Sequence, residues 1–228
     1  MTNDFAARVA GIGALAEPAR RTLYEFVAAS PDPVSREQAA DAVGVPVHSA
    51  KFHLDRLVDE GLLEVEFRRL SGRTGPGAGR PSKLYRRSAA QISVSLPERR
   101  YDLVAEILAA AVERAALEEV PVSDALHEVA ADRGREAGKD TSVAGAGSGR
   151  ERTTQVLAEH GYEPRLRSGE VVLANCPFDA LARAHTELVC GLNEAFVGGV
   201  LEGLECRDLE ACLDPEPGLC CVKARPRR

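Results

Sequence analysis

Residues 34–66 have the sequence VSREQAADAVGVPVHSAKFHLDRLVDEGLLEVE, in which two short helical patterns are separated by a tight turn. Ser35 is a favourable N-cap residue, and Gln38 three positions later completes a capping box. The first helix is predicted to end at Gly44, because glycine readily adopts the left-handed conformation that follows a helix. Pro46 then begins the second helix at an early position, where its missing N–H is not needed. This stretch predicts a helix-turn-helix.

The flanking residues extend this pattern to a winged helix-turn-helix. Pro18 interrupts the helical periodicity of the N-terminal residues, so two separate helices are expected there. The expected elements in order are helices at 5–16, 17–29, 36–43 and 46–60, a strand at 62–70, a glycine-rich turn at 71–79 and a strand at 83–88. A helix-turn-helix places its second helix in the major groove of DNA. Double-stranded operator DNA is therefore the expected partner.

The charge of the chain is unevenly distributed. The net charge is −6, with +3 over residues 1–100 and −9 over residues 101–228. From Arg68 to Arg87 there are seven basic residues and no acidic one. Such a local basic stripe suits a phosphate backbone whatever the total charge, although a solvated basic loop would have the same composition.

The candidate DNA contacts are polar or basic residues outside the apolar stripe of Ala50, Leu54 and Leu57. They comprise His48, Ser49, Lys51, His53 and Arg56 on the second helix, and Arg73, Arg80 and Lys83 on the hairpin. Arg80 precedes a proline that holds the backbone extended, which suits the narrow minor groove. The two histidines have the alternative of being surface residues without a contact, and Phe52 is expected to pack rather than to touch a base.

The second half of the chain is also mainly helical. The domains are predicted as a winged helix-turn-helix at 1–90, a linker and dimerisation helix at 91–122, and a sensor domain at 123–228. The wide apolar stripe of the helix at 98–117 favours a homodimer interface, because two half-sites need two reading heads. Packing of that helix against its own domain is the alternative. The expected fold class is mainly α with small β elements (α+β).

Further helices are predicted at 123–138, 150–160, 179–185 and 186–204, with a hairpin at 162–175. Ser123 is expected to cap the first of these helices. The glycines Gly198, Gly199 and Gly203 lie inside the last one, where they weaken the helix but allow a backbone to approach closely.

All six cysteines lie in the last quarter of the chain. They are Cys176, Cys190, Cys206, Cys212, Cys220 and Cys221. No run of apolar residues is long enough for a membrane span, and the first residues do not resemble a signal peptide, so we expect a cytoplasmic protein without membrane association. In that compartment clustered cysteines suggest metal or redox chemistry rather than structural disulfides.

The spacing of the cysteines does not match a compact metal motif. Cys176 and Cys190 are separated by 13 residues, and Cys190 and Cys220 by 29, unlike the short spacings of zinc ribbons or ferredoxins. A site must therefore be assembled from a loop, a helix and the tail. Thiolates suit iron–sulfur clusters, zinc and Cu(I). His185, Cys206 and Cys212 are the candidates for a fourth ligand, and the alternative is that the cysteines are small buried hydrophobic residues.

Several stretches resemble known families. LAEPARRTLYEFV (15–27), the 34–66 stretch and GRPSKLYRR (79–87) resemble the winged helix of the ArsR-like repressors. NCPFDALARAHTELVCGLNEAF (175–196) and DPEPGLCCV (214–222) resemble the C-terminal domain of the SufR-type iron–sulfur-sensing repressors. The resemblance implies a repressor of iron–sulfur cluster assembly genes whose domain holds a [4Fe-4S] cluster. By matching positions it implies that Cys176, Cys190 and one of Cys220 or Cys221 are ligands, with Cys220 slightly preferred.

Other functions are less compatible with the sequence. A zinc- or thiol-redox-sensing regulator on the same reading head is the alternative function. An enzyme is not expected, because the chain has no glycine-rich phosphate loop, no nucleophile elbow and no zinc-protease helix.

Overall fold

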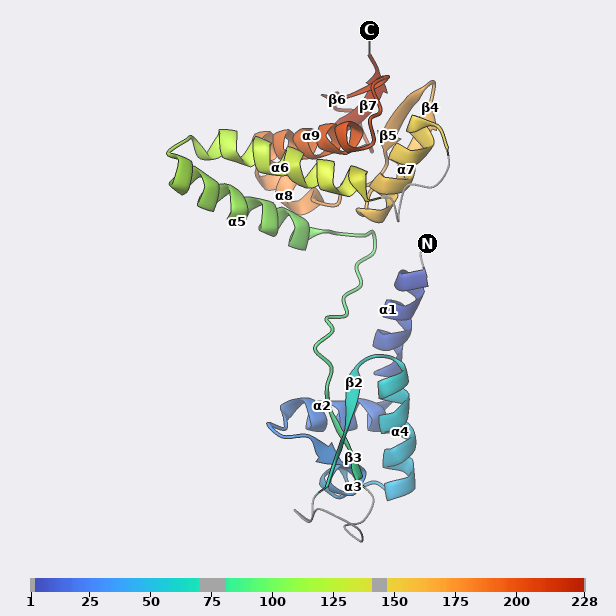
Figure 1. The fold of residues 1–228 in the computed structure, drawn as a ribbon. Coiled ribbons are helices and arrows are strands. Elements are labelled where there is room, and N and C mark those ends of the chain that lie inside the picture. The colour runs from blue at the N-terminus through green and yellow to red at the C-terminus, as the bar shows by residue number, and fades with distance from the viewer. Residues whose placement is uncertain (1–2, 70–80, 141–146, 228) are drawn as a thin grey trace. The chain divides into compact units, whose positions relative to one another are not determined.

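The computed structural model describes residues 3–69, 81–140 and 147–227. The chain divides into two compact units, residues 1–94 and 95–228, each with its own hydrophobic core (Figure 1). The fold is mainly helical with small antiparallel sheets, as predicted. Of the helices in the described ranges, none combines the length and the apolar character needed to cross a membrane.

The first unit contains four helices and a three-stranded sheet in its described part. Its elements are α1 (Asn3–Ala14), α2 (Pro18–Ala29), β1 (Val34–Ser35), α3 (Arg36–Val43), α4 (Val47–Asp59), β2 (Leu63–Arg68) and β3 (Ser82–Arg87). The strand order is β1-β3-β2, and both pairs are antiparallel. Leu23 of α2, Leu54 and Leu57 of α4 and Tyr85 of β3 lie in one core. The winged arrangement is confirmed, apart from the tip at 70–80, which lies outside the described residues.

The caps predicted for the helix-turn-helix are confirmed. The Ser35 hydroxyl accepts a hydrogen bond from the backbone N–H of Gln38, and the Gln38 side chain accepts one from the backbone N–H of Ser35 at 2.8 Å. Gly44 ends α3 with φ 73°, in the left-handed region. Glu17 caps α2, whose first residue is Pro18. The short strand β1 was not predicted, because two residues are too few to show a strand periodicity.

In its described residues, the second unit packs five helices around and beside a four-stranded sheet. Its helices are α5 (Tyr101–Glu118), α6 (Val122–Lys139), α7 (Gly149–Glu159), α8 (Asp179–Ala184) and α9 (Thr186–Gly203). Its strands are β4 (Pro164–Arg167), β5 (Glu170–Leu173), β6 (Leu209–Leu213) and β7 (Val222–Pro226). The prediction that Ser123 caps α6 is wrong: the helix begins at Val122, and Pro121 occupies the cap position.

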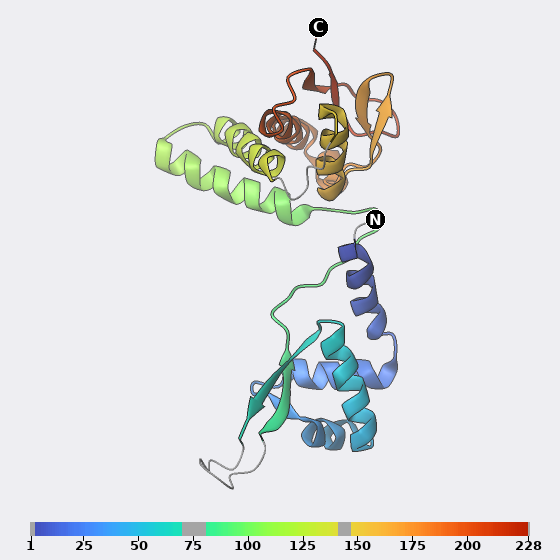
Figure 2. The same ribbon diagram turned by 45° about the vertical axis from the view of Figure 1, so that its right-hand side comes forward.

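The helices α6 and α9 lie side by side at unusually short range (Figure 2). A Cβ atom on Gly199 would lie 2.1 Å from the carbonyl oxygen of Ala131, and one on Gly203 would lie 2.4 Å from that of Arg135. On α6, a Cβ atom added to Gly134 would lie 2.1 Å from the carbonyl oxygen of Phe196. The residue numbers of the contacting positions increase together along both helices, so α6 and α9 run parallel here. The close backbone approach expected at Gly199 and Gly203 is confirmed, whereas Gly198 has an ordinary 3.9 Å neighbour.

The tail of the chain forms two strands that were not predicted. Residues 209–213 and 222–226 form β6 and β7, which complete the sheet in the order β4-β5-β7-β6. Each strand has only five residues, which is short for a strand periodicity to be recognised in the sequence. The connection from β6 to β7 carries Cys220 and Cys221. Sheet formation therefore decides where these two cysteines lie.

The helix α5 belongs to the second unit and buries one side there. Val104, Ile107 and Ala111 are fully buried, packed with α6 in the unit's core. Val112 and Leu117 are exposed on the helix, and 84% of the Leu117 side chain is accessible. Own-domain packing, the alternative to a dimer interface, thus accounts for part of the wide stripe. The rest of the stripe remains uncovered in a single chain.

Candidate nucleic-acid interface and cysteine site

Helix α4 presents a polar face beside its buried stripe. Ala50, Leu54 and Leu57 are buried, as predicted. His48, Lys51, Phe52 and Arg56 are exposed, at the helical spacing that places them on one side. Arg56 forms an ion pair with Glu60 one turn later. The exposed face therefore offers a cation, an imidazole and an aromatic ring to a partner.

Phe52 and His53 differ from what the sequence suggested. The expectation that Phe52 packs is wrong, since 64% of it is exposed. The His53 side chain is only 13% exposed and lies 3.6 Å from Glu17 of α2. Arg20 donates a hydrogen bond to its Nδ1 atom at 3.4 Å. His53 thus joins α4 to α2 in this unit, and its contact with DNA stays a prediction, as does that of the half-buried Ser49.

The hairpin has one described candidate, Lys83. Its ammonium group lies 2.5 Å from the Asp55 carboxylate of α4, which also accepts a hydrogen bond from the Tyr85 hydroxyl at 2.8 Å. Burial, together with this carboxylate, raises the pKa of Tyr85, so the hydroxyl stays protonated and donates. Lys83 is therefore partly neutralised within the protein. Arg73 and Arg80 lie outside the described residues.

One exposed aromatic residue on the hairpin was missed. Phe67 on β2 is 69% exposed, beside Arg68 at the end of the strand. The sequence signal available was an aromatic residue next to two arginines, which is typical of surfaces that contact nucleic acid as well as of ordinary strands. Together with Phe52 it adds apolar surface to the basic head.

The fold brings four of the six cysteines together. The strand β5 leads directly to Cys176, and β7 pairs with β5 so that Val172 lies opposite Lys223. The residues just before β7 therefore meet those just after β5, and the backbone N–H of Cys220 donates to the carbonyl oxygen of Leu173 at 2.8 Å. Cys190 reaches the same place from α9, which packs against β6 and β7.

The four cysteines form two interacting pairs. The Cys220 thiol lowers the pKa of Cys176, while this same contact and burial raise the pKa of Cys220 well above its usual range. Burial raises the pKa of Cys190 to about 11, and the neighbouring Cys221 acts in the same direction. The two pairs are also linked to each other, since Cys176 raises the pKa of Cys190 and Cys221 raises the pKa of Cys220. Both members of the adjacent pair therefore lie beside another cysteine, and which of them is a ligand stays a prediction.

Polar side chains surround this cysteine site. The Asn193 amide of α9 donates to the Cys220 sulfur at 3.3 Å, and the Tyr162 hydroxyl donates to the Asn193 carbonyl oxygen. On the other side, Arg99 donates to the backbone carbonyl of Cys176 at 3.2 Å and to the side-chain oxygen of Asn175. Sequence reasoning missed all of these contacts.

The remaining candidate ligands lie elsewhere. Cys206 contacts Asp208 at 3.1 Å near the start of α7, and burial raises its pKa. Cys212 lies on β6, where burial also raises its pKa. His185 is exposed at the junction of α8 and α9. Across residues 3–69, 81–140 and 147–227, no three His, Cys, Asp or Glu side chains are arranged to hold a single metal ion.

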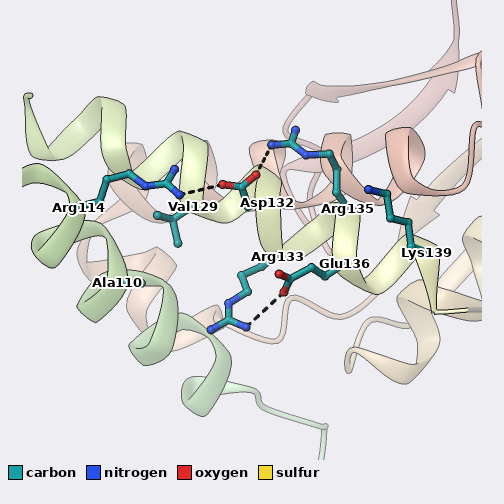
Figure 3. Close-up of a pocket in the computed structure, with 8 residues that line it drawn as sticks. All are labelled: Ala110, Arg114, Val129, Asp132, Arg133, Arg135, Glu136 and Lys139. Atoms are coloured by element: carbon teal, nitrogen blue, oxygen red, sulfur yellow. Dashed lines mark hydrogen bonds and ion pairs between the residues drawn. The ribbon is translucent and has the colours of Figure 1, made fainter. Parts of the chain in front are cut away.

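A separate hollow of 380 Å³ lies between α5 and α6 (Figure 3). Its lining consists of Ala110, Arg114, Val129, Asp132, Arg133, Arg135, Glu136 and Lys139. The guanidinium groups are engaged within the protein: Arg114 and Arg135 both bond Asp132, and Arg133 bonds Glu136 at 3.4 Å. The pair of Arg114 with Asp132 joins α5 to α6, whereas the other two pairs lie within α6. The three guanidinium groups that line the hollow are therefore compensated by carboxylates of the protein.

Comparison with known proteins identifies the family of the first unit. Residues 15–66 match the family described as helix-turn-helix domain. No curated protein and no solved structure matches the chain. The matched residues run from the end of α1 to β2 and include α3 and α4. The first unit is a helix-turn-helix DNA-binding domain with a wing, in agreement with the ArsR-like resemblance, and the chain is a DNA-binding transcriptional regulator.

Proposed function

We propose that this regulator is a dimeric repressor of iron–sulfur cluster assembly genes, and that a [4Fe-4S] cluster held by the second unit controls its binding to operator DNA. The observation that carries the proposal is the convergence of Cys176, Cys190, Cys220 and Cys221 from three separate segments. Soft thiolate donors are the ligands that iron–sulfur clusters use. The proposal also follows the SufR-type resemblance of the second half.

The four thiols match such a group in number and in donor chemistry, although in the described residues no three side chains are arranged around a single metal ion. Four sulfurs come from the β5–α8 loop, α9 and the β6–β7 connection, and Cys190 and Cys220 are buried. Burial in an apolar core protects a cluster from water, and hydrogen bonds to sulfur tune its potential. The cluster would supply one-electron redox chemistry and a sensitivity to oxygen and iron supply. Binding would fasten three chain segments to one another, so loss of it would free them.

A route from this site towards the reading head begins at Arg99. The segment before α5, which follows the first unit in sequence, is fastened to the cysteine loop by several hydrogen bonds. The Asn175 amide donates to the carbonyl oxygen of Glu98 at 2.9 Å, and the backbone N–H of Arg100 donates to that of Pro177 at 3.1 Å. Arg99 binds both Asn175 and Cys176. Any movement of the loop would therefore pull on the segment that leads to the DNA-binding unit.

Dimerisation is proposed through the uncovered side of α5. Val112 is 57% exposed, and the alanines Ala105, Ala109 and Ala116 are exposed at the spacing that continues the same stripe. Small residues allow two helices to approach closely, and a symmetric pair of heads reads two half-sites. A Val112→Glu variant would place a charge on this stripe without touching the buried side. We expect it to be monomeric by light scattering.

The test of the proposed function is iron and sulfide content, with an ultraviolet–visible spectrum, of protein purified without oxygen. We expect a coloured protein with inorganic sulfide, and operator binding by fluorescence anisotropy that changes when the cluster is removed. Cys190→Ser should abolish the colour and leave the helix-turn-helix folded. Cys212→Ser is the matched control and should retain both. A colourless protein that holds stoichiometric zinc would refute the cluster.

The coupling route is tested separately. Arg99→Ala should leave the iron content unchanged while reducing the difference in operator affinity between loaded and stripped protein. Arg225→Ala is the control, because Arg225 pairs with Glu210 on the neighbouring strand β6 at 3.3 Å. An undiminished difference in the Arg99 variant would overturn this route.

A thiol-redox regulator is the second candidate, favoured by the contact within each cysteine pair. Hydrogen peroxide would oxidise two thiols of a pair to one disulfide, with two electrons and two protons leaving the sulfurs to form two water molecules. Mass spectrometry on iron-free protein distinguishes this function. Reversible Cys176–Cys220 and Cys190–Cys221 disulfides that alter operator binding would support it, whereas thiols that stay reduced would exclude it.

A further inference from the structure

Two polar side chains are buried deep in the core of the second unit. Asn193 is 1% exposed and Tyr162 is 3% exposed, among apolar residues that include Phe178 and Phe196. Burying an amide in such surroundings is unfavourable unless its donors and acceptors are satisfied. A leucine would serve the packing of α9 equally well. The asparagine therefore needs a reason connected to its hydrogen bonds.

Those hydrogen bonds lead in one direction, towards Cys220. The Tyr162 hydroxyl donates to the carbonyl oxygen of the Asn193 side chain. This hydrogen bond turns the Nδ2 group of the amide away from the Tyr162 ring. That Nδ2 group donates to the Cys220 sulfur at 3.3 Å. Asn193 lies three residues after Cys190, on the same side of α9. One turn of helix thus carries a cysteine and a donor aimed at a second cysteine.

The hydrogen bond from Asn193 distinguishes the adjacent cysteines Cys220 and Cys221. Cys220 is 5% exposed and receives the amide, whereas Cys221 is half-buried and faces Cys190. Cys221 lies at a bend directly before β7, so a specific contact to Cys220 helps to fix how the chain enters this bend. The contact from Asn193 is of this kind.

We propose that Asn193, oriented by Tyr162, is a positioning residue that selects Cys220 as a metal-site ligand by donating an N–H···S hydrogen bond to its sulfur. The proposal deepens the proposed function and rests on it for the identity of the metal group. The donor holds the sulfur in place before any ligand arrives. It also compensates negative charge on a sulfur that has lost its proton, which water cannot do at this depth.

The test uses the full-length reduced, iron-free protein and Cd²⁺ as a thiophilic probe, followed by the thiolate-to-metal absorption band. Asn193→Leu keeps the branched shape of the side chain at Cγ and removes the donor. It should weaken Cd²⁺ binding about tenfold, the lower end of the range for residues that support metal ligands. The same substitution is then made in Cys220→Ser and Cys221→Ser backgrounds. In the Cys220→Ser background it should not lower the Cd²⁺ affinity further, whereas in the Cys221→Ser background it should still lower the affinity about tenfold.

A purely structural role predicts equal losses in both backgrounds, and that result would overturn the proposal, as would an unchanged affinity in Asn193→Leu. Should this variant fail to fold, Tyr162→Phe removes a single hydroxyl and should weaken binding about fivefold, with the same dependence on Cys220. Thr153→Val, which removes a buried hydroxyl bonded to Gly149 on α7, is the control and should bind like the parent protein.

The cluster and the positioning role of Asn193 can be refuted separately. Iron and sulfide content decides the cluster, whereas the Cd²⁺ titrations decide the role of Asn193. A protein that loads no iron but shows the Cys220-dependent loss retains the positioning role and loses the cluster. A protein that loads iron normally with leucine at position 193 and shows no Cd²⁺ effect retains the cluster and loses the positioning role.

Discussion

The contact between α6 and α9 can be tested with two neighbouring glycines, Gly198 and Gly199. An added Cβ atom on Gly199 would lie 2.1 Å from the carbonyl oxygen of Ala131, whereas Cβ atoms in proteins stay at least 3.0 Å from such atoms. The helices must therefore separate by 0.9 Å or distort. On Gly198 the nearest atom is the Ala211 Cβ at 3.9 Å, an ordinary contact. The two alanine substitutions add the same methyl group to the same helix.

The magnitudes follow from these distances. Both substitutions gain roughly 0.5–1 kcal/mol from the higher helix propensity of alanine. Gly199→Ala also opens a gap of almost 1 Å along a packed helix pair, which removes a quarter to a half of the dispersion energy of the atoms concerned. Overpacking of this kind costs about 1–3 kcal/mol or more. Gly198→Ala is expected to be neutral or slightly stabilising, and Gly199→Ala destabilising by about 2 kcal/mol.

The assay is thermal unfolding of the reduced, iron-free protein followed by circular dichroism. For a unit of this size, about 2 kcal/mol corresponds to a decrease in Tm of roughly 6–10 °C for Gly199→Ala. Because α9 also carries Cys190, the same variant should bind Cd²⁺ more weakly. Equal melting temperatures for the two variants would refute the reasoning, since the calculated clash would then have no energetic consequence.

Three further predictions concern other parts of the chain. Lys51→Ala should weaken operator binding and lower the slope of log affinity against log salt by about 1, because one phosphate contact is lost. Ser35→Ala should leave that slope unchanged and reduce the unfolding free energy of the reading head by about 1 kcal/mol in denaturant titrations, since it removes the cap of α3. In reduced, iron-free protein at pH 8, iodoacetamide should modify Cys176 before Cys190, because the pKa of Cys176 is lowered and that of Cys190 is raised to about 11. Peptide mass spectrometry measures the order, and the reverse order would contradict the pairing of these thiols.

The N-terminal unit was largely predictable because its signals are local. The capping box at Ser35, the left-handed Gly44 and the apolar stripe of α4 depend on neighbours within a few positions. Interactions between residues three and four apart are formed by any helix, so the sequence carries them directly. The exposure of Phe52 was not predictable in this way, because it depends on whether another element covers that side of α4.

The cysteine site shows the opposite case. The sequence by itself determined which residues have thiolate chemistry, that they gather in the last quarter of the chain, and that their spacing excludes a short metal motif. Only the tertiary structure decided that Cys220 and Cys221 both join Cys176 and Cys190, while Cys206 and Cys212 remain apart. The physical reason is that this grouping depends on the pairing of β7 with β5 and on the glycine-mediated approach of α6 to α9. Both are contacts between segments far apart in sequence, and no local pattern encodes the register at which they meet.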